Sequence, residues 1–320
     1  MIKAEGLART FHVKRGREKV DVVAVAGVDI TVDDGEIVGF LGPNGAGKTT
    51  TLRMLTTLLK PTSGQATVAG FDLANEPVKV RQSIGYVSQS GSTSSLALAG
   101  AEIVSHGMLY GISKKQAQTR GHELFDQLDL DGMWERPTKT LSGGQRRRLD
   151  IAMGLVHDPK LVFLDEPTTG LDPQARANLW AHISDLRTKR GSTVFLTTHY
   201  LDEADALCDR IMVIDHGVIV ASDSPDALKR QVSGDLVALT VASAKDAAVA
   251  AKTLTAVAEG DVTTEGLLVS ARVRDGGSAM PDLLRALDAA GASLESIEVR
   301  RPTLDDVFLT MTGRSLRESD

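Results

Sequence analysis

Three short stretches of this chain combine residue types that can do chemistry on a phosphate group. The first is rich in glycine and ends in Lys48 and Thr49. Glycine lets backbone N–H groups approach phosphate oxygens, the lysine places a cation on the β and γ phosphates, and the threonine hydroxyl is a ligand for Mg²⁺. We therefore expect a nucleotide-phosphate loop made of Gly42, Pro43, Asn44, Gly45, Ala46, Gly47, Lys48, Thr49 and Thr50.

The second stretch is the acidic pair Asp165-Glu166, which directly follows the apolar run 161–164. An unpaired charge at the end of a buried strand is costly, so we expect Asp165 to bind an ion, and Mg²⁺ is the natural one. Glu166 is placed to accept the proton of an attacking water. Two adjacent acids in a loop are often only solvated surface, but the apolar run before them and Pro167 after them favour a buried site.

The third stretch, 141–145, ends twenty residues before Asp165. Its serine and glycines are expected to begin a helix, and the N-terminal end of a helix attracts anions. The order of a phosphate loop, a second glycine-rich element and a carboxylate pair predicts ATP hydrolysis by paired subunits. The residues of the third stretch that we expect to contact nucleotide are Ser142, Gly143, Gly144 and Gln145.

The elements that must position these residues alternate as in an α/β domain. The phosphate loop lies between an expected strand at 36–41 and an expected helix at 48–59, so that loop N–H groups and the positive end of the helix face the same anion. Further on we expect a helix that starts after Asp172, ends at Gly191 and has an apolar face of Leu179, Trp180, Ile183 and Leu186, then a strand at 193–198 that ends at His199, and a hairpin of strands 211–214 and 218–220.

The organisation changes near residue 222. A short helix to about residue 231 and a joint at Ser233-Gly234 separate a first domain, 1–232, from a second, 233–320. The second domain is predicted to be a small α+β domain with a last helix that begins at Thr303, where Asp306 completes a capping pattern. Its other expected elements are strands at 236–240, 267–273 and 294–299 and helices at 244–256 and 280–290.

Composition favours a cytoplasmic protein of about two domains. No stretch reaches the roughly 18 consecutive apolar residues of a membrane span, and the sequence starts without the apolar run of a signal peptide. The net charge of −6 gives no overall attraction to nucleic acid. The run 146–148 of three arginines is expected to be solvated or at an interface rather than a nucleic-acid patch, and Cys208 is expected to be a buried apolar residue rather than a reactive thiol.

Together these motifs resemble a known family. Residues 1 to about 232 resemble the nucleotide-binding subunit of an ABC transporter, and the chain is most similar to the daunorubicin-type drug-resistance ATP-binding subunits through the segments 142–150, 109–111 and 301–308. The resemblance implies an α/β fold, a P-loop NTPase ABC cassette with a helical signature subdomain, followed by the small C-terminal domain. It implies ATP and Mg²⁺ as cofactors.

The resemblance also implies roles that spacing alone does not give. Gln89 corresponds to the glutamine that touches Mg²⁺ and water, and His199 to the γ-phosphate contact, although a lone histidine at a strand end is more often structural. Phe11 matches the aromatic residue that stacks on adenine, with a core phenylalanine as the alternative. The 142–145 loop would cap ATP bound to the opposite subunit, and Asp172 would lie at that interface. We therefore expect a homodimer.

The implied function is an ATPase that energises export of a drug or other hydrophobic compound through a separate integral membrane permease. This permease would dock near Gln89 and the segment 96–110, which places the chain at the cytoplasmic face of the membrane. A soluble ABC ATPase that acts on ribosomes or DNA, an exporter of lipid, polysaccharide or peptide, and an inert regulatory module are the alternatives. For the C-terminal domain, a role in assembly and a plain folding appendage both stay open.

Overall fold

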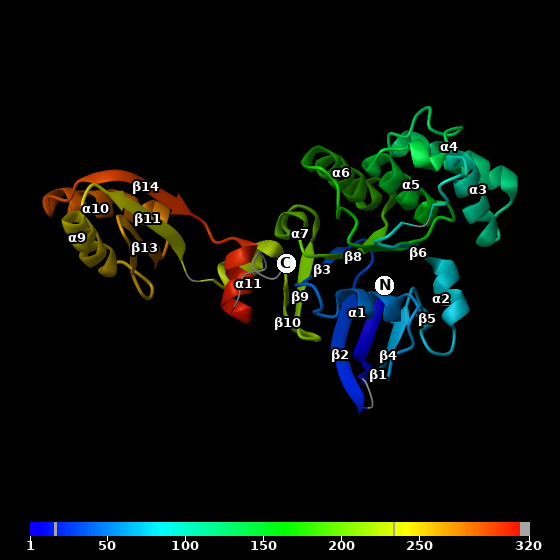
Figure 1. The fold of residues 1–320 in the computed structure, drawn as a ribbon, viewed down its shortest axis with the longest axis horizontal. Helices are drawn as coiled ribbons and strands as arrows, with labels where there is room; N and C mark the ends of the chain where they lie inside the picture. The colour runs from blue at the N-terminus through cyan, green and yellow to red at the C-terminus, as the bar shows by residue number, and fades with distance from the viewer. Residues whose placement is uncertain (16–17, 92, 233, 314–320) are drawn as a thin grey trace. The chain divides into compact units, whose positions relative to one another are not determined.

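The computed structural model describes residues 1–15, 18–91, 93–232 and 234–313. Within these residues the chain divides into two compact units, 1–225 and 226–313 (Figure 1). The division falls seven residues before the expected boundary at 232. Of the expected joint, Ser233 lies outside the described residues and Gly234 has a positive φ of 69°. The last seven residues of the expected second domain, 314–320, also lie outside the described residues.

A six-stranded sheet forms the centre of the first unit, in the order β10-β9-β3-β8-β7-β6. The strands β6, β7, β3, β8 and β9 are parallel, and β9 and β10 form the expected antiparallel hairpin. Every residue of β3, β7 and β8 is buried, as in parallel sheets that are covered on both faces. The strands are β3 (Ile37–Leu41), β6 (Ile84–Val87), β7 (Leu161–Asp165), β8 (Thr193–Thr198), β9 (Arg210–Asp215) and β10 (Val218–Asp223).

A second, antiparallel sheet of the first unit has the order β2-β1-β4-β5. Its long hairpin of β1 and β2 was not expected from the sequence. In it Phe11 pairs with Val22, and residues 12–15 and 18–23 continue the two strands. The strands are β1 (Ile2–Arg15), β2 (Glu18–Val32), β4 (Ser63–Val68) and β5 (Phe71–Asp72).

The helices of the first unit include a separate group, α3, α4 and α5, that lies together beyond the β6 edge of the central sheet (Figure 1). The helix after the phosphate loop is shorter than expected and ends at Leu55 instead of residue 59, because Thr57 takes a left-handed φ of 63°. The helices are α1 (Lys48–Leu55), α2 (Pro77–Ser83), α3 (Ala99–Leu109), α4 (Lys114–Gln127), α5 (Gly143–Leu155), α6 (Pro173–Arg190) and α7 (Leu201–Leu207), with a 3-10 turn at Thr138–Thr140.

The second unit contains a β-α-β-β-α-β arrangement whose sheet has the order β12-β13-β11-β14. Alternate residues of β11, such as Val237 and Leu239, are buried in a core with residues of α9 and α10, such as Leu283. The elements are α8 (Pro225–Arg230), β11 (Asp235–Val241), α9 (Ala244–Thr255), β12 (Thr263–Glu265), β13 (Leu268–Val273), α10 (Gly276–Ala289), β14 (Leu294–Arg300) and α11 (Leu304–Thr312).

Two details of this unit differ from the prediction. The short strand β12 was not expected, and α10 begins at Gly276, four residues before the predicted start at Met280. The early start is fixed because Gly276 N–H donates to the Asp235 carboxylate at 3.0 Å. The predicted capping pattern of Thr303 and Asp306 at the last helix is present. In the part of the chain that the structure describes, no helix combines the length and apolar character needed to cross a bilayer.

Candidate nucleotide site

The phosphate loop lies where β3 ends and α1 begins. Gly47 is the N-cap of α1 with φ 110°. Because glycine has no side chain to cap the helix, the first N–H groups of α1 are left available to bind an anion. A Cβ at Gly47 would lie 2.7 Å from the carbonyl oxygen of Ala24 in β2, which only glycine avoids. Asn44 and Gly45 at the tip of the loop are exposed. The loop therefore has the shape of a phosphate cradle.

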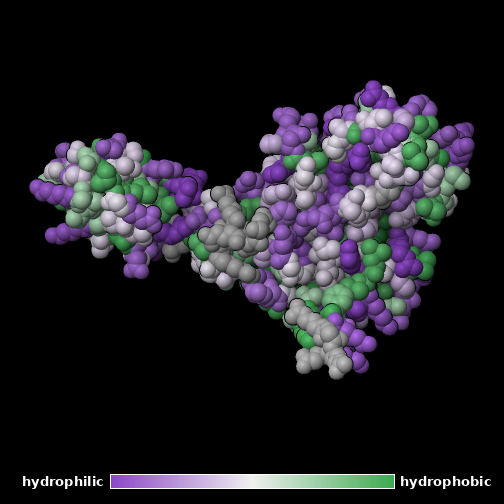
Figure 2. Space-filling model, viewed as in Figure 1, coloured by the Kyte–Doolittle hydropathy of each residue, from purple (hydrophilic) through white to green (hydrophobic). Residues whose placement is uncertain are grey.

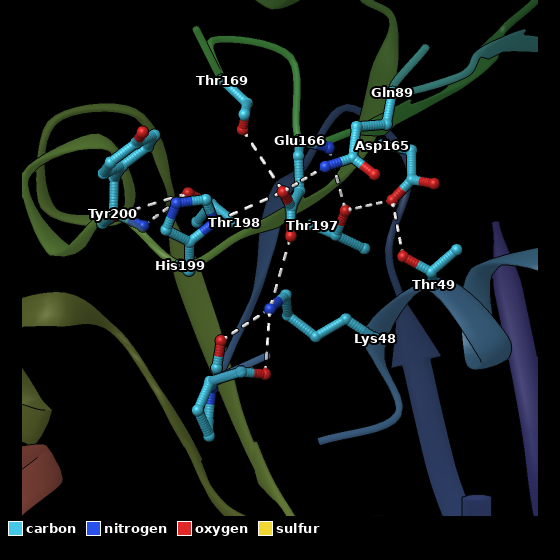
Figure 3. Close-up of polar contacts among 12 residues, drawn as sticks. Lys48, Thr49, Gln89, Asp165, Glu166, Thr169, Thr197, Thr198, His199 and Tyr200 are labelled. Atoms are coloured by element: carbon cyan, nitrogen blue, oxygen red, sulfur yellow. Dashed lines mark hydrogen bonds and ion pairs between the residues drawn. The ribbon is translucent and has the colours of Figure 1, made fainter. Parts of the chain in front are cut away.

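Lys48 is folded back over this loop (Figure 3). Its ammonium donates to the carbonyl oxygens of Gly42 at 2.7 Å and Pro43 at 3.1 Å. The same Nζ atom lies 3.4 Å from Glu166 Oε1, and both side chains are buried. The loop and the acidic pair, which are far apart in the sequence, are thus joined by one cation.

Asp165 and Thr49 face each other across the site. Thr49 Oγ1 donates to Asp165 Oδ1 at 3.2 Å, and Thr197 Oγ1 at the end of β8 donates to the same oxygen at 2.7 Å. No group of three or more histidine, cysteine or acidic side chains gathers as a metal site among the described residues. Mg²⁺ in nucleotide sites uses one or two carboxylates together with phosphates and waters, so the pair Thr49 and Asp165 fits this ion.

Glu166 is the centre of the polar contacts in Figure 3. Gln89 Nε2 donates to its Oε2 atom at 2.8 Å and Thr169 Oγ1 at 3.3 Å, while His199 Nδ1 lies 3.3 Å from the same oxygen. Burial by itself raises the pKa of Glu166, but the His199 ring and the Lys48 ammonium outweigh it, so this pKa lies below its ordinary value. The side chain is therefore a carboxylate, which is the form that accepts a proton.

The residues of the third stretch, 142–145, which we call the signature residues, lie at the start of α5. Ser142 is the N-cap of this helix, and its hydroxyl accepts from Gln145 N–H while the Gln145 side chain accepts from Ser142 N–H. Asp172 is the N-cap of α6, and its Oδ1 atom accepts one hydrogen bond, from Ala175 N–H at 2.9 Å. Ser142, Gly143 and Asp172 are exposed, in contrast to the buried lysine and acidic pair. These two loops thus present their polar groups to solvent.

Phe11 lies on β1 of the hairpin, close to the place where the neighbouring strand β2 touches the phosphate loop. Its partner on β2 is Val22, and Ala24 on the same strand packs against Gly47. The Phe11 ring is partly exposed and has the Arg9 guanidinium 4.7 Å from its centroid. A side chain in a closed core would be covered on all sides, so its position is that of an accessible aromatic surface.

Two buried charged residues of this region were missed or misjudged from the sequence. Arg147 was expected to be solvated or at an interface, but it is buried and donates to backbone carbonyl groups. Glu203 in α7 is fully buried, and its Oε1 atom accepts from Trp180 Nε1 at 3.2 Å. Trp180 therefore has a polar partner in addition to its place on the helix face. Cys208 is buried, as expected.

Comparisons with known proteins identify the family of this chain. Residues 25–169 match the family model described as ABC transporter, and residues 224–312 match the model described as ATP-binding protein DrrA1-3-like, C-terminal domain. The chain therefore belongs to the ABC transporter ATP-binding family, and it is an ATPase.

Relatives that match nearly the full length of the chain show which members of this family it is similar to. The chain is 39% identical over 321 residues to a daunorubicin resistance ATP-binding protein DrrA2 of Streptomyces coeruleorubidus, a match that covers 100% of this chain and 97% of the relative. It is 40% identical to a doxorubicin resistance ATP-binding protein DrrA of Mycobacterium tuberculosis, over 94% of this chain and 92% of that one. A Nod factor export ATP-binding protein I of Burkholderia lata is 36% identical, over 93% and 95% of the two chains.

Solved structures confirm the fold class. The dimeric post-hydrolysis state of the ATP-binding cassette MJ0796, bound to ADP and Pi, has a TM-score of 0.63 and 26% identity, and the match covers 70% of this chain and 98% of that one. The chain is thus the ATP-binding, ATP-hydrolysing subunit that energises an ABC transporter. The alternative of a soluble ABC ATPase that acts on ribosomes or DNA is not favoured.

Proposed function

We propose that this chain, as a homodimer with Mg²⁺, powers export of a drug or another hydrophobic compound through a separate membrane permease. The observation that carries the proposal is the full-length similarity to daunorubicin and doxorubicin resistance proteins, which includes the C-terminal unit. Because both units match, the similarity is not that of a generic ATP-binding cassette alone. We assign the cassette to residues 1–232 and the accessory domain to 233–320.

In this proposal each contact of the site has a chemical task. Glu166 accepts the proton of the attacking water, His199 contacts the γ-phosphate, and Gln89 orients the water, since both side chains already meet the Glu166 carboxylate. Bound Mg²⁺ would be held by Thr49, Gln89 and Asp165 and would neutralise charge on the phosphates. The nucleotide-binding residues are Phe11, Gly42, Pro43, Asn44, Gly45, Ala46, Gly47, Lys48, Thr49, Thr50, Ser142, Gly143, Gly144, Gln145 and Asp172.

Pairing of two copies is supported by the exposure of the signature residues. Ser142 and Gly143 begin a helix whose N-terminal end can attract phosphate, yet they face solvent while Lys48 is buried. A phosphate bound to another copy would satisfy them. The structurally similar cassette MJ0796 is a dimer, which supports the same arrangement here.

Docking of a permease is supported by an apolar surface on the helical group. Leu96, Met108 and Leu109 are 77%, 52% and 83% exposed, and Figure 2 shows apolar side chains at the surface in this part of the unit. Ser95, which directly precedes Leu96, lines a cavity of about 300 Å³ together with Gln89. A membrane partner seated on this surface would reach a residue that contacts Glu166, and it would hold the chain at the cytoplasmic face of the membrane.

The test is transport with a candidate partner. The chain is co-expressed with a membrane protein of about six spans encoded beside its gene, the two are co-purified, and ATP-dependent uptake of daunorubicin is measured in inverted vesicles. We expect uptake that requires both proteins and is lost with Glu166→Gln. Co-purification with ATP-dependent uptake of an oligosaccharide but not of the drug would overturn the assigned substrate class.

A further inference from the structure

One guanidinium in the first unit makes contacts that no motif describes. Arg147 in the second turn of α5 is 7% exposed. Its Nε atom donates to the Pro167 carbonyl oxygen at 2.7 Å and its Nη1 atom to that of Ser88 at 2.5 Å. Its Nη2 atom donates to the carbonyl oxygens of Asp165 at 3.0 Å and Glu166 at 3.4 Å. One side chain thus joins α5, the segment after β6 and the loop after β7.

The chemistry of these contacts requires an arginine. A guanidinium offers five donors in a rigid plane, so it can bind carbonyl groups on several sides at once, while an ammonium is a point charge on a flexible stem. Burial lowers the pKa of Arg147, and the carboxylates of Asp150 and Asp165 partly offset this effect. A buried cation is costly unless its donors are bonded, and the carbonyl oxygens satisfy them.

The contact with Glu166 falls on strained backbone. Glu166 has φ 43°, a left-handed conformation that is unfavourable for a residue other than glycine and persists only where the surroundings fix it. From β8, Thr197 fixes the nitrogen side, since Glu166 N–H donates to its carbonyl oxygen at 3.1 Å and its hydroxyl at 3.0 Å. On the carbonyl side Arg147 makes the corresponding contact. The direction of the Glu166 side chain therefore depends on α5.

The same guanidinium also reaches the segment that carries Gln89. Ser88, whose carbonyl oxygen it binds, directly precedes Gln89, and the Gln89 amide contacts the Glu166 carboxylate. Ser142, the N-cap of α5, lies on the same helix five residues before Arg147. The signature serine and the two residues around the attacking water are thus connected through a single side chain.

We propose that Arg147 is a positioning residue that fixes Glu166 and Gln89 relative to the signature helix, so that hydrolysis of ATP, but not its binding, depends on the guanidinium. The inference rests on the proposed role of Glu166 as the base. A shift of α5 would move the carbonyl groups on both sides of the site together, which links the position of Ser142 to the geometry of hydrolysis.

The experiment compares Arg147→Lys and Arg147→Gln with Arg148→Gln, a neighbour on the same helix whose side chain lies 4.0 Å from Asp129. ATP affinity is measured by calorimetry and turnover by phosphate release, with thermal melts to establish folding. We expect kcat to fall about a hundredfold in both Arg147 variants, as for small misplacements of catalytic groups, while ATP affinity stays unchanged. Arg148→Gln should keep wild-type values.

A double-mutant cycle separates positioning from general stability. If Arg147 acts through Ser88 and Gln89, the combined loss in Arg147→Lys with Gln89→Ala will be smaller than the product of the separate losses. Wild-type kcat in Arg147→Lys, independent effects in the cycle, or a parallel loss of ATP affinity and folding would overturn the inference. Undiminished hydrolysis by Glu166→Gln would instead overturn the proposed site, so the two failures are distinguishable.

Discussion

The two units of this molecule differ in what they bury. The first encloses charged side chains, among them Lys48, Arg147, Asp165, Glu166 and Glu203, each less than 10% exposed. Within the described residues of the second unit, every buried side chain is apolar or glycine. Burial of a charge is costly unless it is paired and hydrogen-bonded. In the first unit these groups have polar partners: Lys48 pairs with Glu166, Arg147 donates to backbone carbonyl oxygens and Glu203 accepts from Trp180. The second unit is held by apolar packing.

The difference predicts where substitutions act. In the first unit, changes of charged residues should alter ATP binding or hydrolysis with less effect on folding. In the second unit, the core around Val237 and Leu239 includes no residue of the candidate site, so changes there should act on folding. Measurements that separate turnover, affinity and stability therefore test the comparison directly.

The largest effect is expected for Glu166→Gln. The amide keeps the shape of the side chain but cannot accept the proton, so turnover should fall by a factor of about 10²–10⁴. ATP binding should persist, and the stalled protein should run as an ATP-dependent dimer on gel filtration. Glu298→Gln on the exposed face of β14 is the matched control in the second unit. Undiminished hydrolysis by Glu166→Gln would remove its role as base.

Leu239→Ala should have the next largest effect, and it should fall on stability. Leu239 is fully buried in β11, and loss of such a side chain lowers the free energy of unfolding by about 2–5 kcal/mol. Denaturant unfolding measures the loss, and calorimetry with ATP should show unchanged affinity. Leu196→Ala in β8 is the matched variant of the first unit. The next residue of this strand, Thr197, donates to Asp165, so this variant should lower both stability and ATP affinity. Equal loss of ATP affinity in the two variants would break the comparison.

Lys48→Ala should weaken ATP binding itself. In the proposed site the lysine would supply a charge-assisted hydrogen bond to phosphate, worth about 1.5–3 kcal/mol, so affinity should fall about ten- to a hundredfold in calorimetry. Exposed Lys252 of α9 offers the corresponding change in the other unit, and Lys252→Ala should leave affinity as it is. A Lys48→Ala protein with wild-type affinity would mean that the loop does not hold phosphate through this side chain.

A residue of the candidate site could be predicted from the sequence when the residues that act with it are close to it in the chain. The phosphate loop and the pair Asp165-Glu166 act through residue types that are adjacent in sequence, so their spacing was informative. Arg147 binds backbone carbonyl oxygens of residues 18 to 59 positions away in the chain. Because every residue has a backbone carbonyl group, the sequence does not indicate which ones accept these bonds. The neighbours of Arg147, Arg146 and Arg148, are also arginines, so composition gave no reason to single it out.

The same distinction holds for the fold. Continuous apolar runs predicted β3, β7 and β8, because buried parallel strands need little else. The β1–β2 hairpin was missed since its outer part exposes Val13 and Val22 instead of alternating apolar and polar residues. The start of α10 was placed too late because it begins with two glycines, which have low helix propensity, and the Asp235 contact that fixes it comes from another strand.

The smallest predicted effect concerns Glu203. Burial raises the pKa of this carboxyl above its ordinary 4.5, and the hydroxyls of Thr198 and Thr168 only partly oppose it. The contribution of this neutral carboxyl to the stability of the wild type is therefore fully present below about pH 4.5 and is lost as pH rises through the folded-state pKa. Glu203→Gln stays neutral at every pH and can still accept from Trp180, so its advantage in unfolding free energy should grow as pH rises above 4.5 and level off above the folded-state pKa.

Urea unfolding at a series of pH values measures this difference, with exposed Glu123→Gln as the control that should show no such trend. An advantage of Glu203→Gln that does not change with pH would mean that folding does not shift the pKa of this carboxyl. A trend of the opposite sign would mean that the carboxylate is stabilised in its site. That second result would group Glu203 with Asp165 and Glu166, which are buried beside hydrogen-bond donors.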